Sequence, residues 1–200
     1  MRERIDIFKA EFPEFRSLAE EQIRALIYIY DQNVGRRGGA LDPAISVAGG
    51  LLLWVGWLFF NSASGYEIVD LAPDILPVKI AVNTIIAAAV AGITYAAAAS
   101  ISLQSSHAMK TLDPAGIMAA VLAGLVAVTG ACNNVSAPDA ACIGFVGCLC
   151  YMTSAHLMRR WAIDDPIEAA QIHGFTGMWG VAAVGIFDAD AGLLYSGSTA

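Results

Sequence analysis

The chain has 200 residues, of which 57% are hydrophobic and only 14% are charged. An ordinary soluble domain carries roughly 25% charged residues, so this composition excludes a typical water-soluble fold. The net charge of −7 matters less than the positions of the charges, which gather at the N-terminus and between long apolar runs.

Residues 1–40 differ from the rest of the chain because they carry seven acidic and seven basic side chains. Ser17 followed by Glu20 is typical of a helix capping box, and apolar residues then recur at one-face helical spacing from Ile23. We therefore predict a separate N-terminal segment, residues 1–40, with an amphipathic helix on the cytoplasmic side that docks on the membrane surface or on another domain. No apolar core of a secretory signal is expected within it.

Five apolar runs follow, and none of them contains Asp, Glu, Lys or Arg: residues 44–61, 80–103, 115–131, 140–158 and 169–187. Each is near the length of about 17 to 25 residues that a helix needs to cross a bilayer. The sequence therefore predicts an all-α membrane protein with about five transmembrane helices. Five is an odd number, and it matches one half of a transporter built from two halves of inverted topology.

The basic residues predict the orientation. If the N-terminus is cytoplasmic, ten of the eleven Lys and Arg residues lie inside and only Lys79 lies outside. Cytoplasmic loops of membrane proteins are enriched in Lys and Arg, so a cytoplasmic N-terminus is favoured.

Small residues in the third and fourth spans predict close helix packing, as at Gly124 and Gly144. The four cysteines match no zinc or haem-attachment spacing. We predict that they are buried packing residues: Cys132, Cys142, Cys148 and Cys150.

The last span begins after Asp164 and Asp165, whose carboxylates are expected to cap its N-terminus. Its single ionisable residue, His173, is the strongest functional signal in the chain. An ionisable residue within a membrane span usually marks a transport pathway or a proton relay, although a histidine bonded at both ring nitrogens to neighbouring helices is the alternative. Neither His107 nor His156 lies at a matching depth, so we expect a partner from outside these five spans. The absence of a second histidine also argues against a haem ligand.

The first span carries a cluster of aromatic residues. Phe60 and Ser64 lie one turn apart on one helical face, which suits a gate beneath a polar vestibule. The other interpretation is an interfacial belt of Trp54, Trp57, Phe59 and Phe60 that anchors the helix, and spacing alone favours the belt.

Several ordered motifs resemble the ammonium transporters of the Amt/Mep/Rh superfamily: LLLWVGWLFFNSASG, VNTIIAAAVAG, LAGLVAVTGAC, DDPIEAAQIHGFTGMWG and GLLY, between Leu41 and Ser198. The resemblance covers spans six to ten only, the second inverted repeat. It implies that Ser64 is the hydroxyl that recruits ammonium, Phe60 one gate phenylalanine, Trp57 a pore-lining residue and His173 the second of two hydrogen-bonded histidines. The resemblance therefore favours the gate over the belt.

The same resemblance implies what is missing. The first five spans of the family, with the first histidine, the other gate phenylalanine and the outer tryptophan, have no counterpart here, and Phe59 stands where the family has glycine. We therefore expect residues 41–200 to form a partial ammonium transporter domain that is inactive alone.

The expected function is transmembrane transport of ammonium or ammonia, without enzymatic activity, cofactor, metal or nucleic-acid partner. The expected partners are the substrate, the lipid bilayer and, if the missing spans are supplied, two further copies in a homotrimer in the plasma membrane. The alternative is a membrane-embedded regulatory or assembly subunit that associates with full-length ammonium transporters.

Overall fold

The computed structural model describes residues 43–65, 76–105, 113–163, 165 and 167–196, together with residues 6, 9–10, 13 and 22–23. The chain divides into two compact units, Met1–Gly39 and Ala40–Ala200. Apart from Gln22 and Ile23, the amphipathic helix expected near the N-terminus lies outside the described residues. The fold below is that of the second unit.

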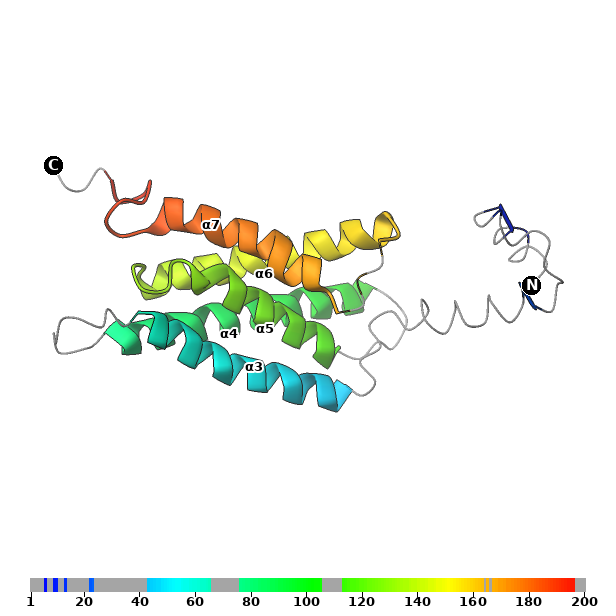
Figure 1. Ribbon diagram of the computed structural model, residues 1–200, viewed down its shortest axis with the longest axis horizontal. Coiled ribbons are helices and arrows are strands. Elements are labelled where there is room, and N and C mark those ends of the chain that lie inside the picture. The colour runs from blue at the N-terminus through cyan, green and yellow to red at the C-terminus, as the bar shows by residue number, and fades with distance from the viewer. Residues whose placement is uncertain are drawn as a thin grey trace. The chain divides into compact units, whose positions relative to one another are not determined.

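The described part of this unit is entirely helical: α3 (Pro43–Ser64), α4 (Leu76–Ser105), α5 (Pro114–Thr129), α6 (Ala137–Arg160), the π-helix η2 (Ala170–Phe175) and α7 (Thr176–Phe187). Successive helices run in opposite directions beside one another, and α7 continues directly from η2 (Figure 1). The helices coincide with the five predicted apolar runs, so the all-α membrane fold is confirmed. Of these helices, α3, α4 and α6 are each long and apolar enough to cross a membrane, whereas α5 is shorter, with 16 residues.

Short polar side chains define where helices begin. Asp113 accepts a hydrogen bond from the backbone N–H of Ala115 and caps α5. Ser136 and Asp139 form a capping box at the start of α6, which satisfies backbone donors that the helix itself leaves free. These caps place the polar turns at the ends of the apolar helices.

The helices approach most closely at the backbone of Ala87 in α4. A Cβ atom added at Gly124 of α5 would lie 2.7 Å from the Ala87 carbonyl oxygen, and one added at Gly144 of α6 would lie 2.2 Å from it. Such distances leave no room for a side chain, so the predicted close packing of small residues is confirmed.

The cysteines follow the prediction only in part. Cys132 and Cys148 are buried among the helices, as expected. Cys142 is exposed and Cys150 is only partly buried, so the prediction of burial was wrong for these two.

Buried amides hold α4 in place. The side-chain amide of Asn83 donates to the carbonyls of Cys132 and Val135, which joins α4 to the turn between α5 and α6. Asn61 of α3 donates to the hydroxyl of Thr84, 3.1 Å away. Backbone and side-chain polar groups in hydrocarbon need internal partners, and these bonds supply them between helices.

The loop after α7 folds back on the turn before α6. The Asn134 amide donates to the carboxylates of Asp188 and Asp190 at 3.0 and 2.9 Å. Hydrogen bonds from the Ala191 N–H, the Asn134 amide and the Asp190 N–H lower the pKa of Asp188. The Tyr195 hydroxyl donates to the carboxylate of Asp139 at the start of α6, and this hydrogen bond raises the pKa of Tyr195.

Candidate functional site

His173 lies in the only described segment with π-helical geometry, Ala170–Phe175. The Asp165 carboxylate accepts hydrogen bonds from the backbone N–H groups of Ala169 and Ala170, 3.1 and 2.7 Å away, which confirms the predicted cap for this residue. Single π-helical turns inside helices occur frequently at functional sites, because the wider turn re-aims a side chain. The geometry therefore singles out the segment that carries the intramembrane histidine.

The imidazole of His173 is exposed on the surface of the bundle. It stacks on the indole ring of Trp57, with 6.3 Å between ring centroids and 20° between planes. The ring makes no hydrogen bond to any residue of the described ranges. A neutral imidazole carries one hydrogen-bond donor and one acceptor. Neither group is bonded by a described residue.

Trp57 is itself held from a second helix. Its indole N–H donates to the hydroxyl of Thr129 at the end of α5, over 2.8 Å. The Thr129 hydroxyl donates its own proton to the carbonyl of Leu125, over 2.7 Å, so its free lone pair faces the indole. Two hydrogen bonds in series thus fix the ring on which His173 stacks.

Sequence reasoning missed Thr129. The residue stands within the motif LAGLVAVTGAC, but nothing in the spacing of that motif connects it to a tryptophan 72 residues earlier. A hydroxyl in the last turn of an otherwise apolar helix was the only signal.

Phe60 and Ser64 lie together near the end of α3. The side chain of Phe60 is 59% exposed, and the Ser64 hydroxyl donates to the Phe60 carbonyl over 2.7 Å. Ser64 is also exposed, so its oxygen can still accept a hydrogen bond. The structure joins Trp57 to His173, but it gives no contact between Phe60 and His173, and the neighbouring Phe59 is 73% exposed.

Three buried polar atoms near the site have no hydrogen-bond partner among the described residues. They are Oε1 of Gln171, in the same π-helix as His173, Nε1 of Trp54, one turn before Trp57, and Oδ1 of Asn61, one turn after it. Leaving a buried donor or acceptor unpaired costs about 1 to 3 kcal/mol. The polar groups of this region are therefore incompletely satisfied by the described helices. Within the same ranges, His, Cys, Asp and Glu form no cluster of three that could hold a metal ion.

A model of the Ammonium Transporter Family matches residues 37–199 of the chain. The chain belongs to this family. The match includes Trp57, Phe60, Ser64 and His173, so all four residues singled out by the sequence lie within family sequence. The relatives are ammonium transporters, a non-enzyme class, and the membrane-length helices together with the family match make this chain an integral membrane protein.

Relatives and solved structures agree with this assignment. The chain is 33% identical to the ammonium transporter Amt1 of Archaeoglobus fulgidus over 175 residues, which are 81% of this chain and 41% of that protein. It is 32% identical to ammonium transporter 1 member 3 of Solanum lycopersicum, over 73% of this chain and 29% of the relative.

Among solved structures, Saccharomyces cerevisiae Mep2 matches with a TM-score of 0.63 and 30% identity, over 74% of this chain and 31% of that one. A structure described as a sensor Amt protein also gives a TM-score of 0.63, at 29% identity, over 78% of this chain and 36% of that one. The chain thus spans less than half the length of the family members that it matches.

Proposed function

We propose that this chain is the second half of an ammonium-conducting pore, and that it transports ammonium or ammonia only when the complementary half is present. The observation that carries the proposal is the exposed imidazole of His173, which stacks on the fixed indole of Trp57 and makes no hydrogen bond to the described part of the chain. An ionisable side chain at membrane depth is retained at a cost, and it is usually found where a pathway or proton relay needs it.

The physics of the substrate explains why such a site needs two halves. Moving a bare cation from water into a dry pore costs on the order of 20 kcal/mol in the idealised limit. Contact with aromatic faces stabilises a desolvated cation by only about 2 kcal/mol. This is enough to recruit ammonium at the pore entrance but not to carry the cation through the pore. Ammonium must therefore lose its proton, or share it with a base, inside the pore.

The residues divide between recruitment and passage. Ser64 accepts a hydrogen bond from ammonium at the outer end of α3, and the exposed ring of Phe60 forms one side of the gate below it. The indole of Trp57 lines the pathway and holds the plane of the imidazole ring. His173 then takes up a proton or orients neutral ammonia, together with a histidine from the complementary half.

The orientation and assembly follow from the same proposal. Residues 1–40 form a cytoplasmic segment, and residues 41–200 form the partial transporter domain in the plasma membrane. Arg159 and Arg160 end α6 at the cytoplasmic face, whereas Lys79 lies near the opposite, outer end of the bundle. Once completed, the unit assembles as a homotrimer.

The test uses cells that depend on ammonium uptake. The chain is expressed alone, and together with a fragment that carries spans one to five of a complete family member. We expect growth at low ammonium only from the pair, and its loss when His173→Ala replaces the wild-type chain. His156→Ala, which removes an exposed histidine at the end of α6, is the matched control and retains growth.

Two results would contradict the proposal. Growth supported by the chain alone would refute the half-pore, and failure of the pair while both fragments are in the membrane would refute the pore itself.

A regulatory or assembly subunit is the second candidate, and the surface of α3 favours it. Leu52, Val55 and Phe59 form an exposed apolar row along this helix. Such a row suits contact with another transporter subunit as well as with lipid. Co-purification of the tagged chain with a complete ammonium transporter, combined with no growth from the pair of halves, would support this candidate.

A further inference from the structure

A hydrogen bond joins α6 to the residue from which the His173 segment starts. The hydroxyl of Tyr151, in α6, donates to the carboxylate of Glu168 over 2.6 Å. Tyr151 is only 3% exposed, so the donor is enclosed in the bundle. Hydrogen bonds to a carboxylate are shorter and roughly twice as strong as those between neutral groups. This bond therefore fixes Glu168 against α6.

The backbone of Glu168 is left-handed, with φ of 55°. A residue with a Cβ atom adopts this conformation at a cost, and it persists where surrounding contacts hold it. The left-handed turn precedes the N–H groups that the Asp165 carboxylate caps. The Glu168 carbonyl accepts a hydrogen bond from the N–H of Ile172, over 2.9 Å. The conformation of Glu168 thus sets where the last span becomes helical.

Tyr151 is linked to the last span in a second way. Its aromatic ring belongs to the buried apolar cluster that also contains Ile172, the residue before His173. Tyr95 of α4 lies beside the Tyr151 ring, with 6.1 Å between ring centroids. Tyr151 is therefore held by a neighbouring helix, and it contributes to fixing the turn that carries the imidazole at both of its ends.

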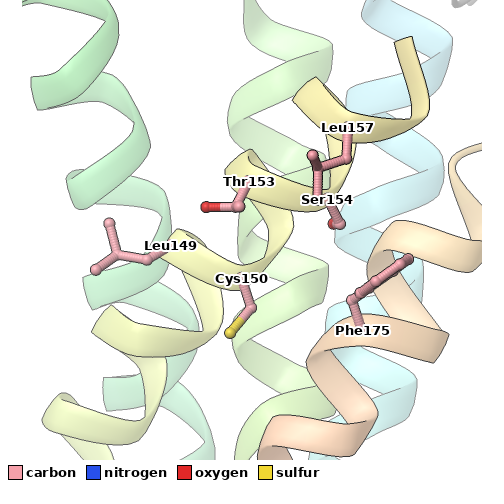
Figure 2. A pocket seen from close by; sticks show the side chains of 6 residues that line it. All are labelled: Leu149, Cys150, Thr153, Ser154, Leu157 and Phe175. Carbon is pink, nitrogen blue, oxygen red and sulfur yellow. The ribbon is translucent and has the colours of Figure 1, made fainter. Parts of the chain in front are cut away.

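Beyond His173 the packing of η2 on α6 is more open. Figure 2 shows a hollow between Phe175 of η2 and side chains of α6 that include Leu149 and Ser154, and its volume is about 260 Å³. Apolar contact between these two described helices is thus incomplete after the imidazole. Because π-helical turns are rare, specific contacts must hold this one, and the bond to Glu168 is the strongest candidate.

We propose that Tyr151 and Glu168 are positioning residues for His173, and that their hydrogen bond holds the last span in the π-helical register that stacks the imidazole on Trp57. The inference rests on the proposed role of His173 in the passage of ammonium. Without the bond, Glu168 can leave the left-handed conformation, and the turn after it can relax toward α-helical geometry. A π-helical turn holds about one residue more than an α-helical turn, so this change rotates the imidazole away from the indole.

Nuclear magnetic resonance of the full chain in detergent, with isotope-labelled histidine, tests the position of the ring. His173→Ala assigns the resonances, and Trp57→Leu gives their position without the ring current of the indole. We expect Tyr151→Phe to lower the ratio of stacked to unstacked imidazole about tenfold, the effect of losing a hydrogen bond to a charged group. Glu168→Ala should do the same. Glu168→Gln, whose amide oxygen can still accept from Tyr151, should leave the ring mostly stacked.

Ser154→Ala is the matched control. The buried Ser154 hydroxyl donates to the Tyr151 carbonyl over 2.9 Å, so this variant removes a hydrogen bond within α6 and leaves the bond to Glu168 in place. The His173 resonances should not move. Equal displacement of the imidazole in Ser154→Ala and Tyr151→Phe would mean general loosening and would overturn the proposal, as would an unmoved imidazole in Tyr151→Phe. Glu168 is only partly buried, so Glu168→Ala decides the matter if Tyr151→Phe does not fold.

Transport with the complementary half is a separate readout. Tyr151→Phe and Glu168→Ala should slow growth at low ammonium, whereas Glu168→Gln and Ser154→Ala should not. Undiminished growth with a displaced ring would overturn the positioning role. Failure of the wild-type pair to grow would instead refute the proposed function, and the resonances of the chain alone would still show whether the bond places His173.

Discussion

The hydrogen bond between Trp57 and Thr129 can be removed without changing the shape of the site. Thr129→Val keeps the volume of the side chain but deletes the acceptor of the indole N–H, which lies 2.8 Å away. Thr129→Ser is the matched control, because its hydroxyl can still accept from Trp57 and donate to Leu125. Thr129→Val also removes the hydrogen bond from Thr129 to the Leu125 carbonyl, so the bond between α3 and α5 is isolated only by a double-mutant cycle with Trp57.

The size of the effect follows from where the bond lies. A typical internal hydrogen bond contributes about 0.5 to 1.5 kcal/mol, and an unpaired buried donor costs about 1 to 3 kcal/mol. Bonds between transmembrane helices average about 0.6 kcal/mol by double-mutant cycles. Because Trp57 is only half-buried, the lower values apply. We expect Thr129→Val to lower the free energy of unfolding by about 1 kcal/mol, or about fivefold in the equilibrium constant.

Reversible unfolding of the full chain in mixed detergent measures this difference. Trp57→Phe and the double variant complete a thermodynamic cycle, in which we expect a coupling free energy of about 0.6 to 1.5 kcal/mol. In the assay with the complementary half, Thr129→Val should also slow growth at low ammonium, whereas Thr129→Ser should not. Equal stability of the valine and serine variants, or no coupling with Trp57→Phe, would refute the claim that Thr129 positions the indole.

Three further predictions address the rest of the bundle. Asp165→Ala removes the side-chain cap of the last helix and should cost about 0.5 to 2 kcal/mol, with faster amide hydrogen exchange at its first turn; unchanged exchange would contradict the cap. Gly144→Ala should destabilise the bundle by about 1 to 3 kcal/mol through overpacking, whereas Gly56→Ala, with nothing within 4 Å of the added atom, should be neutral or slightly stabilising in thermal unfolding. The pKa of Asp188 is lower in the folded chain than in the unfolded chain, where it is about 4. Its hydrogen bonds therefore stabilise the fold at pH values above the unfolded-state pKa, and this stabilisation is lost as the pH falls through the folded-state pKa. Asp188→Asn should therefore reduce the acid dependence of unfolding between about pH 5 and pH 2, and an unchanged pH profile would show that the loop contributes nothing.

The fold was predictable because apolar length in a membrane protein is a strong signal. A bilayer fixes the length of a spanning helix, so five uncharged runs located the helices before any contact was known. The cap at Asp165 and the close packing at Gly144 were also predictable, since both depend on local sequence. The exposure of Cys142 was not predictable, because residue type alone does not say which face of α6 is covered.

The candidate site was only partly predictable. His173 stands out by its charge in an apolar run, and Trp57, Phe60 and Ser64 stand out through the family motifs. The contact between His173 and Trp57 depends on how the first and last helices pack, which no local pattern encodes. The π-helical turn was missed as well, because one residue more per turn leaves no compositional trace.

Ala87 shows how mutations in this bundle will combine. Its carbonyl oxygen is the point at which both Gly124 and Gly144 approach α4, so three helices share one contact. A larger side chain at Gly124 or at Gly144 must move α4. Once α4 has moved, substitution of the other glycine costs less free energy of unfolding. The two changes will therefore show epistasis, with a combined effect smaller than the sum, and evolutionary exchange at one glycine will open a path to exchange at the other.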